Sequence, residues 1–370
     1  MITSLDESLL HQGAETFAHA LSSDHRFFDR TVLGMQSPTG DLALITSMGV
    51  YKNNNVMDGF AMIQEACARQ YNSRFSRSLR PNIDELVLGP LSIEVIEPLK
   101  RLRLRLEPGD YPASYDIEWT AALPPYQEPR HFQRHDGRIS SDYLRFDQLA
   151  TATGWIALDG RRTDFKDWFA WRDHSWGVRP GVGGFDTVTG EARPRADFLY
   201  LFVWWLTEAD GGLLQLQEDG RGGRLYLDGH ILSRADPGGR ALKVIDAQHE
   251  IQFRPGARVF DRVRVTARTD DGQIWEIEGE SLGRPWVYKG SGYDSGYNDE
   301  RGLGCWRSEW LEEFDVYDVT DPEACGLPDG RRIRPMHREQ FARVTINGRP
   351  GFAHLPLLNA GRIEKYGLGS

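Results

Sequence analysis

Short segments of alternating apolar and polar residues, interrupted by turn residues at roughly ten-residue intervals, constrain this chain more than any other feature. In the second half, Asp-Gly occurs at positions 210, 219, 228 and 271, and this dipeptide is typical of tight β-hairpin turns. In the first half, RLRLRLEP at 101–108 would place its leucines on one face of a half-buried antiparallel strand. The chain has no GxGxxG that opens a helix after a strand, no P-loop and no GxSxG. We therefore predict an all-β protein, either a sandwich or a barrel.

The composition limits the partners that this chain can bind. Its 370 residues carry 44 Lys and Arg against 54 Asp and Glu, a net charge of −10, which argues against nucleic acid or an anionic membrane as a partner. The 3 cysteines form no CxxC, so neither a disulfide framework nor a zinc ribbon is expected. The sequence shows no signal peptide and no apolar run near the roughly 20 residues that a membrane span requires. We expect a cytoplasmic protein without membrane insertion, and the oligomeric state is left open.

The order of the predicted elements divides the chain. Apolar residues at near-helical spacing and a capping pair, Ser4 and Glu7, predict one helix at 4–22. Residues 60–79 fit either a helix or a hairpin, and their periodicity does not decide between the two. The glycine-rich PGVGG at 180–184 is the best candidate for a domain boundary. The predicted parts are a β domain at 1–180 with the helix outside it, a second β domain at 181–345, and a tail at 346–370.

Metal binding is not predicted. His131 and His135 have the spacing of two ligands on one helical face, but they lie in a proline-rich segment, 124–138, that contains Asp136-Gly137. Because such a segment is a poor helix former, we predict no metal site there and a protein without a cofactor.

The segment FAWRDHSWGVR at 169–179 is the strongest candidate for chemistry, because it gathers aromatic residues around one acid, one histidine and two arginines. As a strand, it would send alternate side chains to opposite faces. The two sets are Arg172, His174 and Trp176 on one face, and Trp171, Asp173 and Ser175 on the other. We expect the first face to line a cavity. Asp173 cannot pair with His174 across a regular strand, so we expect it to anchor the motif structurally, together with Trp171.

The residue types on the first face suit proton transfer. His174 is the predicted general acid/base, because an imidazole pKa near 6.5 suits proton transfer at neutral pH. Trp176 would offer an apolar wall and a ring face for a developing cation. Arg172 and Arg179 would bind a carboxylate or an enolate-like oxygen. Together these groups suit hydration, dehydration or double-bond isomerisation of a hydrophobic molecule.

Two further regions would contribute to the same cavity. In the apolar strand predicted at 196–206, Tyr200 and Trp204 share a face and would form the opposing wall, with Tyr200 as a second acid/base. Tyr51 and Asn54 belong to a polar cluster that could reach the pocket. A strand rich in tryptophan and arginine would equally suit core packing around a buried Asp–Arg pair at a domain junction, and the residues alone leave both interpretations open.

Three segments resemble the AttH-like and carotenoid-hydratase-like superfamily, whose members pair two lipocalin-like β-barrel domains. They are GVYKNNNVMDGF (49–60), GPLSIEVIEPLKRLRLRLEP (89–108) and, most specifically, DHSWGVR (173–179), and the resemblance extends from about residue 40 to 320. It implies an apolar cavity at the domain junction and a strand pair at 60–79. Characterised members act on large hydrophobic molecules.

The resemblance also implies roles for individual residues. In the hydratases, a motif histidine and tryptophan match His174 and Trp176, and a tyrosine and an aspartate follow on a later strand. That strand would be 196–206, which offers Tyr200 but has Phe202 where the aspartate is expected. The acid nearby is Asp197.

Sequence and resemblance together predict an all-β protein with two lipocalin-like antiparallel β-barrel or sandwich domains and an N-terminal helix. Its expected function is that of a cofactor-free lyase, hydratase or isomerase acting on a terpenoid, steroid-like or aromatic molecule at the domain junction. The alternative is a non-catalytic carrier of a hydrophobic small molecule. The predicted catalytic residues are His174, Tyr200 and Asp197, and the predicted substrate-binding residues are Trp176, Arg172, Arg179, Trp204, Tyr51 and Asn54.

Overall fold

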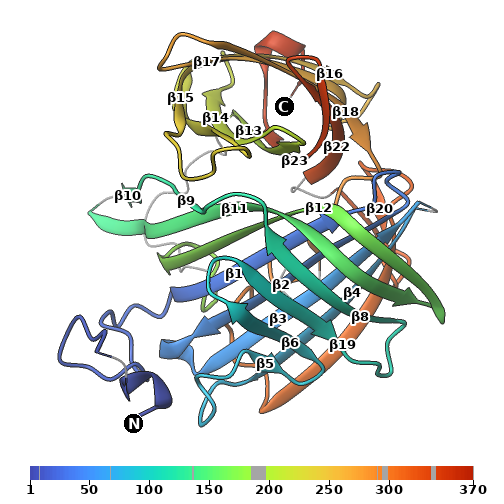
Figure 1. Ribbon diagram of the computed structural model, residues 1–370. Helices are drawn as coiled ribbons and strands as arrows, with labels where there is room; N and C mark the ends of the chain where they lie inside the picture. The colour runs from blue at the N-terminus through green and yellow to red at the C-terminus, as the bar shows by residue number, and fades with distance from the viewer. Residues whose placement is uncertain are drawn as a thin grey trace.

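The computed structural model describes residues 1–7, 9–66, 68–135, 137–184, 197–289, 291–293, 299–334 and 339–369. In these residues the chain forms a large antiparallel sheet and a closed antiparallel barrel that lies against it (Figure 1). The predicted all-β, lipocalin-like fold class is therefore confirmed. None of the helices described is long and apolar enough to span a lipid bilayer.

The large sheet combines the strands of the first half of the chain with three strands from the second half. Their order is β21-β20-β19-β4-β3-β2-β1-β12-β11-β8-β7-β6-β5, and β9 and β10 pair with β11. The bounds are β1 Phe27–Gln36, β2 Leu42–Tyr51, β3 Val56–Glu65, β4 Arg69–Ser78, β5 Val87–Leu88, β6 Leu91–Glu97, β7 Arg101–Leu106, β8 Ala113–Ala121, β9 Tyr126–Gln127, β10 His131–His135, β11 Arg138–Leu158, β12 Arg161–Val178, β19 Trp310–Asp318, β20 Cys325–Gly326 and β21 Arg332–Ile333.

The barrel is closed by the pairing of β13 with β23, and its strands follow the order β13-β14-β15-β16-β17-β18-β22-β23. Their bounds are β13 Phe198–Thr207, β14 Asp210–Asp219, β15 Arg224–Ser233, β16 Leu242–Phe253, β17 Phe260–Thr269, β18 Ile274–Leu282, β22 Glu339–Ile346 and β23 Arg349–Ala360. The helices described are short 3₁₀ turns: η1 Ser4–Glu7, η2 Lys52–Asn54 and η3 Glu364–Tyr366.

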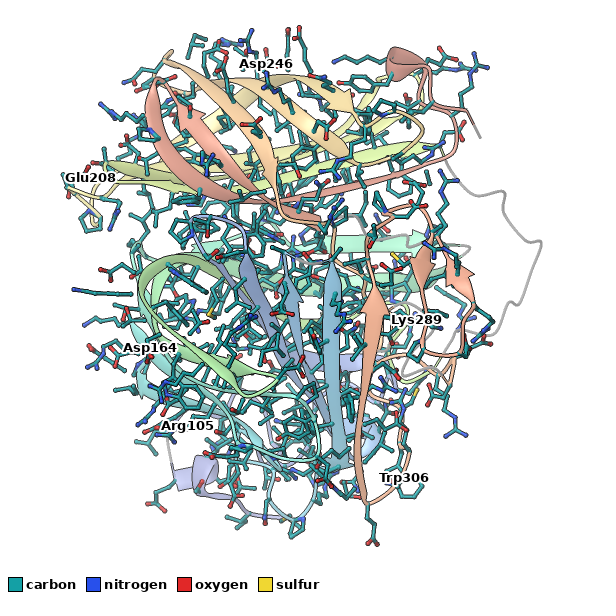
Figure 2. All side chains as sticks on the ribbon, turned by 90° about the vertical axis from the view of Figure 1, so that its right-hand side faces the viewer. Arg105, Asp164, Glu208, Asp246, Lys289 and Trp306 are labelled. Carbon is teal, nitrogen blue, oxygen red and sulfur yellow. The ribbon has the colours of Figure 1, made fainter. Side chains whose placement is uncertain are left out.

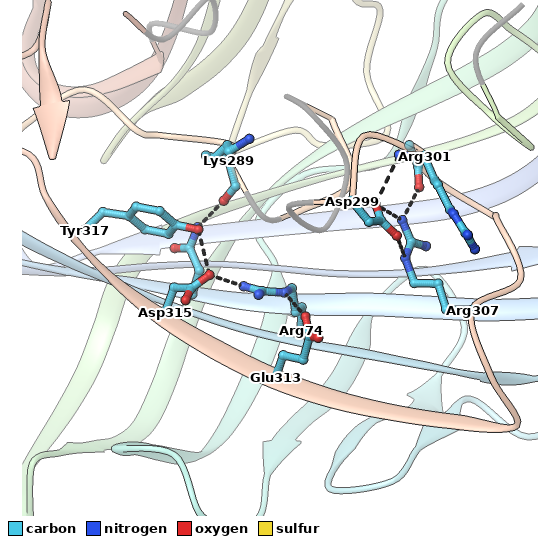
Figure 3. A network of polar contacts seen from close by, with 10 residues as sticks. Arg74, Lys289, Asp299, Arg301, Arg307, Glu313, Asp315 and Tyr317 are labelled. Carbon is cyan, nitrogen blue, oxygen red and sulfur yellow. Dashed lines mark hydrogen bonds and ion pairs between the residues drawn. The ribbon is translucent and has the colours of Figure 1, made fainter. Parts of the chain in front are cut away.

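The large sheet includes a segment of chain that lies, in sequence, between two strands of the barrel. β19 lies between barrel strands β18 and β22 in sequence, yet it pairs with β4 of the large sheet along its whole length. Figure 3 shows the charged groups that hold it there. Arg74 on β4 donates to Glu313 at 2.8 Å and to Asp315 at 2.6 Å. The strand pairing thus crosses the expected boundaries. Strands within 310–333 belong to the large sheet. Strand β23, which lies in the expected tail, completes the barrel.

Side chains alternate along each strand, so the large sheet has two faces, and apolar cores lie on both. One face lies inside the curl of the sheet and carries a core that includes Leu104, Trp119 and Trp168. The opposite face packs against the barrel. This second core contains Val32, Ile45, Phe60, Phe169 and Trp171 from the sheet, and Phe202, Trp204, Leu213 and Phe341 from the barrel. In Figure 2, Asp246 marks the barrel and Trp306 marks the far end of the large sheet. Because the second core contains residues of both structures, it lies where they meet.

Stacked rings hold the two structures together at the centre of this contact. The Trp171 ring on β12 lies 4.7 Å from that of Trp204 on β13, at an interplanar angle of 7°, and 4.3 Å from that of His354 on β23. Gly34 on β1 faces Trp171 across the strand pair, and a Cβ atom there would lie 2.5 Å from the indole. Glycine at this position is therefore what lets the indole lie flat across β1.

The structure overturns one predicted element and decides between the two alternatives for another. The predicted helix at 4–22 is wrong, since among the described residues of this segment only Ser4–Glu7 are helical, as a short 3₁₀ turn. Leu5, Leu9, Leu10 and Leu21 are all exposed, so no surface receives the apolar face that such a helix would need. Residues 60–79 form the β3–β4 hairpin, which confirms the strand pair implied by the resemblance.

We expect Gly34→Ala to destabilise the protein by about 1–3 kcal/mol, because the added methyl group would displace the Trp171 indole from a filled core. Urea unfolding followed by tryptophan fluorescence measures this change. Gly238→Ala is the matched control, because a Cβ atom at that exposed glycine meets nothing within 4 Å. Equal unfolding midpoints for the two variants would contradict the role given to Gly34.

Candidate functional site

One end of the contact between sheet and barrel is polar and charged. Because side chains alternate, the strand face that carries Trp171 and Leu149 also carries Asp173, Asp147 and Arg145. From the barrel, the face that carries Trp204 contributes the polar residues of neighbouring strands. These are Tyr200 on β13, Gln215 on β14, and Asp228 and His230 on β15.

A buried ion pair organises this polar end. Arg145 donates from Nε to Glu128 Oε1 at 2.8 Å and from Nη2 to Oε2 at 2.9 Å. The Glu128 side chain is 0% exposed. The barrel joins the pair through Gln215, whose amide donates to Glu128 Oε1 and whose carbonyl oxygen accepts the Tyr200 hydroxyl at 3.2 Å. The pair therefore connects the two β structures.

The pKa values of two neighbouring carboxyl groups are shifted in opposite directions. Burial by itself would raise the pKa of Glu128, but the charge of Arg145 and the hydrogen bond from His131 hold it below its usual range. Burial and the negative charge of Glu128 raise the pKa of Asp147 well above its usual range, and Arg145 offsets this only in part. The surroundings of Asp147 therefore favour its protonated form, and those of Glu128 favour its ionised form.

Asp173 adds a third carboxyl group, directly opposite Asp147 across the β11–β12 pair. Burial raises the pKa of Asp173 to about 6, while the charge of Arg145 opposes the rise. Carboxylates that face each other on adjacent strands repel when both are ionised. The aspartate of the D-H-S-W-G-x-R motif is thus part of the same coupled group of acids.

A small pocket opens beside Asp147. Its walls come from both β structures: Leu123, Pro124, Asp147, Gln148, Leu149, Trp204, Leu213 and His230. The space open to the centre of a water molecule is about 10 Å³, close to the least that one water needs. The resemblance implied an apolar cavity at this junction, and the pocket found here is apolar apart from Asp147, Gln148 and His230.

His230 faces Asp147 from the barrel side of this pocket. Its ring stacks on Tyr126 at 3.8 Å, and the Tyr126 hydroxyl donates to Asp228 at 3.0 Å. Burial lowers the pKa of His230 to about 3, so the imidazole is neutral at pH 7. A carboxyl group whose burial favours its protonated form and a neutral imidazole therefore line one pocket, which is an arrangement suited to giving and taking protons.

The structure brings some of the sequence-predicted residues to this junction and separates others. Tyr200, Trp204, Trp171 and Asp173 all lie there. His174 lies on the opposite face of β12, where its Nε2 is 2.7 Å from Asp29 Oδ1 and its side chain is 34% exposed. The alternation predicted for the motif is present, but the face that meets the barrel is the one that carries Asp173.

The other two members of the His174 face pack with it. The Trp176 ring lies 5.5 Å from that of His174. Arg172 donates to Gln148 at 3.0 Å and lies over the Trp119 ring at 4.8 Å, and burial lowers its pKa to about 10. This face thus belongs to the inner side of the curled sheet.

The remaining predicted residues lie apart from the pocket. Arg179 lies over the rings of Phe28 and Tyr293, and the Tyr51 hydroxyl accepts a hydrogen bond from Arg30 at 2.7 Å. Half-buried Asn54 donates to the His25 carbonyl at 2.8 Å. Asp197, which is exposed, accepts the backbone N–H of Arg362 at 3.0 Å.

Sequence reasoning missed Glu128, Arg145, Asp147 and His230. The i, i+2 spacing of Arg145 and Asp147 marks one strand face, but only the barrel packed over it makes that face buried. His230 follows Asp228-Gly229, which was predicted to be a turn and instead lies within β15. A Cβ atom at Gly229 would lie 2.5 Å from the Leu213 carbonyl oxygen, so this glycine serves close strand contact.

Among the residues described, no group of three His, Cys, Asp or Glu side chains could hold a metal ion. His131 and His135, the pair considered for zinc, lie on β10 rather than on a helix, and His131 Nε2 lies 2.6 Å from Glu128 Oε2.

Comparison with known proteins gives one family match and several structures of similar fold. Residues 2–368 match the model of a family of unknown function (DUF8625), and none of the curated proteins matches the chain. Among solved structures, AttH (NE1406) from Nitrosomonas europaea is similar with a TM-score of 0.53 and 13% identity, over 91% of this chain and 93% of that one. CghA gives a TM-score of 0.48 and 10% identity over 90% and 88% of the two chains. Kievitone hydratase from Nectria haematococca gives 0.42 and 11% over 90% and 89%.

At such low identities these similarities concern the fold alone. The similarity to the AttH structure confirms that this chain shares its fold, as the sequence resemblance implied.

We expect the stability of Asp173→Asn relative to wild type to increase with pH. The pKa of Asp173 is about 6 in the folded protein and about 4 in an unfolded chain, so folding takes up a proton between these values. The stability contributed by this proton is complete below about pH 4 and is lost as pH rises through 6, by up to about 3 kcal/mol. Urea unfolding at pH 4, 5, 6 and 7 measures the difference, with exposed Asp164→Asn as the control for loss of one charge. A pH-independent difference for Asp173→Asn would contradict the prediction.

Proposed function

We propose that this chain, which belongs to a family of unknown function (DUF8625), is a cofactor-free enzyme that transfers protons on a hydrophobic small molecule where the sheet meets the barrel. The reaction class is hydration, dehydration or double-bond isomerisation, and the substrate class is terpenoid, steroid-like or aromatic. The observation that carries the proposal is that Asp147, whose pKa is raised by burial, and His230, whose pKa is lowered by burial, line one small pocket from the sheet and from the barrel.

Asp147 is the proton donor in this proposal. A carboxyl group that stays neutral at pH 7 can protonate a double bond or a leaving hydroxyl group, as an ionised one cannot. After donation, the new carboxylate at Asp147 lies 3.9 Å from the Arg145 guanidinium, which stabilises its charge.

His230 is the proton acceptor. In a hydration, water attacks the cation that proton donation leaves on the substrate, and the imidazole takes the proton that this water loses. The net result is one water added, with one proton gained by His230 and one lost by Asp147. Dehydration is the reverse, and isomerisation uses the same two groups without water. The Trp204 ring in the pocket wall would favour a cationic intermediate nearby.

The walls indicate the kind of substrate. Leu123, Leu149, Leu213 and Trp204 favour an apolar group at the reacting end of the molecule. The pocket as it stands holds about one water, so a substrate enters by displacing these side chains. Tyr200 contributes a hydroxyl group that stays protonated, because burial raises its pKa well above its usual range.

His174 has a different place in this proposal from the one predicted by the sequence. It lies on the opposite face of β12 and pairs with Asp29, so we assign the proton donor to Asp147. The Asp173 carboxyl group is the part of the motif that contributes to the junction.

We expect Asp147→Asn to lower turnover about 100-fold or more, because the amide keeps the shape of the carboxyl group but cannot give up a proton. The measurement is product formation from a panel of terpenoid, steroid and aromatic alkenes and alcohols in D₂O, with deuterium incorporation read by mass spectrometry. Asp164→Asn, an exposed carboxylate far along β12, is the matched control and should turn over like wild type.

Other outcomes would decide against the proposal. Saturable binding by wild type without turnover would favour the carrier alternative. Wild-type turnover by both Asp147→Asn and His230→Gln would remove the junction pocket from the mechanism. Loss of turnover in His174→Ala alone would return the chemistry to the opposite face of β12.

A further inference from the structure

We infer that the junction pocket binds one ordered water molecule, held by Asp147, His230 and Trp204, and that this water is the one added or removed in the reaction. The inference rests on the proposed function and narrows it to hydration and dehydration, because an isomerisation uses no water. Two observations carry it: the size of the pocket and the unpaired polar atoms of its walls.

Three residues of the pocket wall contribute buried polar atoms that no protein group pairs. Within the part of the chain that the structure describes, both carboxyl oxygens of Asp147, Nδ1 of His230 and Nε1 of Trp204 form no hydrogen bond. These residues are 2%, 6% and 3% exposed. Arg145 Nε is 3.9 Å from Asp147 Oδ1, which is beyond hydrogen-bond distance. Because native proteins pair nearly all buried polar atoms, often with an internal water, these atoms indicate a ligand.

The fourth polar residue of the wall shows the contrast. The Gln148 amide donates to two backbone carbonyl oxygens at 2.7 and 3.0 Å, and its Oε1 accepts Arg172 at 2.6 Å. The protein therefore satisfies this side chain by itself. The three residues with unpaired atoms, Asp147, His230 and Trp204, come from β11, β15 and β13, and they meet only where the sheet packs against the barrel.

The size and the hydrogen-bonding chemistry of the pocket identify its ligand. The space open to the centre of a water molecule is about 10 Å³, which admits one such molecule. The Trp204 indole N–H only donates, so the ligand has to accept a hydrogen bond. The Asp147 carboxyl group carries oxygen lone pairs in either protonation state, so a ligand that also donates can bond to it. A water molecule does both, whereas a halide ion only accepts and an ammonium ion only donates.

The position of this water gives it a role. Asp147 lines the pocket from the sheet and His230 from the barrel, so a water bonded to both lies between the proton donor and the proton acceptor. In hydration, the proton of Asp147 forms the new C–H bond and the water oxygen forms the C–O bond. One O–H bond of that water breaks, and its proton passes to His230. Dehydration runs the same steps in reverse.

The same site explains how the two groups return to their starting states. A second water that enters the pocket accepts the proton from His230 and gives one of its own protons to Asp147. The complete cycle then converts one alkene and one water into one alcohol, and the enzyme gains or loses no proton.

The first test needs no substrate. We expect a crystal structure of the wild-type protein to show one water within hydrogen-bond distance of Asp147 and His230. In solution, oxygen-17 relaxation dispersion counts long-lived internal waters, and we expect Asp147→Leu and His230→Leu each to hold one fewer than wild type, because each removes a polar partner. The exposed Asp164→Asn is the control and should keep the wild-type count. The wild-type structure decides the matter even where a variant does not fold.

The second test follows the water into product. In water enriched in oxygen-18, we expect each alcohol molecule formed from an alkene of the panel to carry one oxygen-18 atom. Products with shifted double bonds and no oxygen-18 would overturn the inference and leave the proposed function intact. A dry pocket in a wild-type crystal that shows other internal waters would also overturn the inference alone. A bound water without turnover of any substrate would support the binding site but overturn the proposed function and the role given to this water.

Discussion

The buried ion pair between Arg145 and Glu128 is the interaction on which the titratable groups of the junction depend. Desolvation makes two charges costly to bury unless their geometry is good and their remaining hydrogen-bonding positions are occupied. Here the guanidinium forms two bonds to the carboxylate, and Gln215 and His131 occupy its other sides. Burial and the negative charge of Glu128 raise the pKa of Asp147, and Arg145, which forms both of these bonds with Glu128, offsets the rise only in part from 3.9 Å.

The same pair can exist only because both sides of the sheet are covered. β11 and β12 run beneath the barrel, so a strand face that would otherwise be solvated becomes an interior. At one end of this interior the stacked rings of Trp171, Trp204 and His354 exclude water. At the other end the charged cluster and the pocket lie between the two β structures. The aromatic end holds the two structures in contact, and the polar end benefits from the low dielectric that this contact creates.

The D-H-S-W-G-x-R segment serves both faces of its strand. Its aspartate and the preceding tryptophan face the barrel, where they join the acids and the stacked rings. Its histidine faces the other way and pairs with Asp29. A segment of this composition suggested at first that its own acid and histidine could act together. Strand alternation separates them by the thickness of the sheet, and their partners come from other strands.

The sequence by itself determined the local pattern. Alternation and turn residues identified the all-β class, a strand within 101–108 and the faces of 171–176, because a period of two depends only on neighbouring residues. It did not reveal that the 4–22 segment lacks a surface to pack on, nor that Asp228-Gly229 lies within a strand. Only the tertiary structure decided which face of β12 meets the barrel. It also brought Glu128, Arg145 and Asp147 together with Tyr200 and His230. The physical reason is that burial, and with it the pKa of Asp147, is set by what packs over a strand from far along the chain.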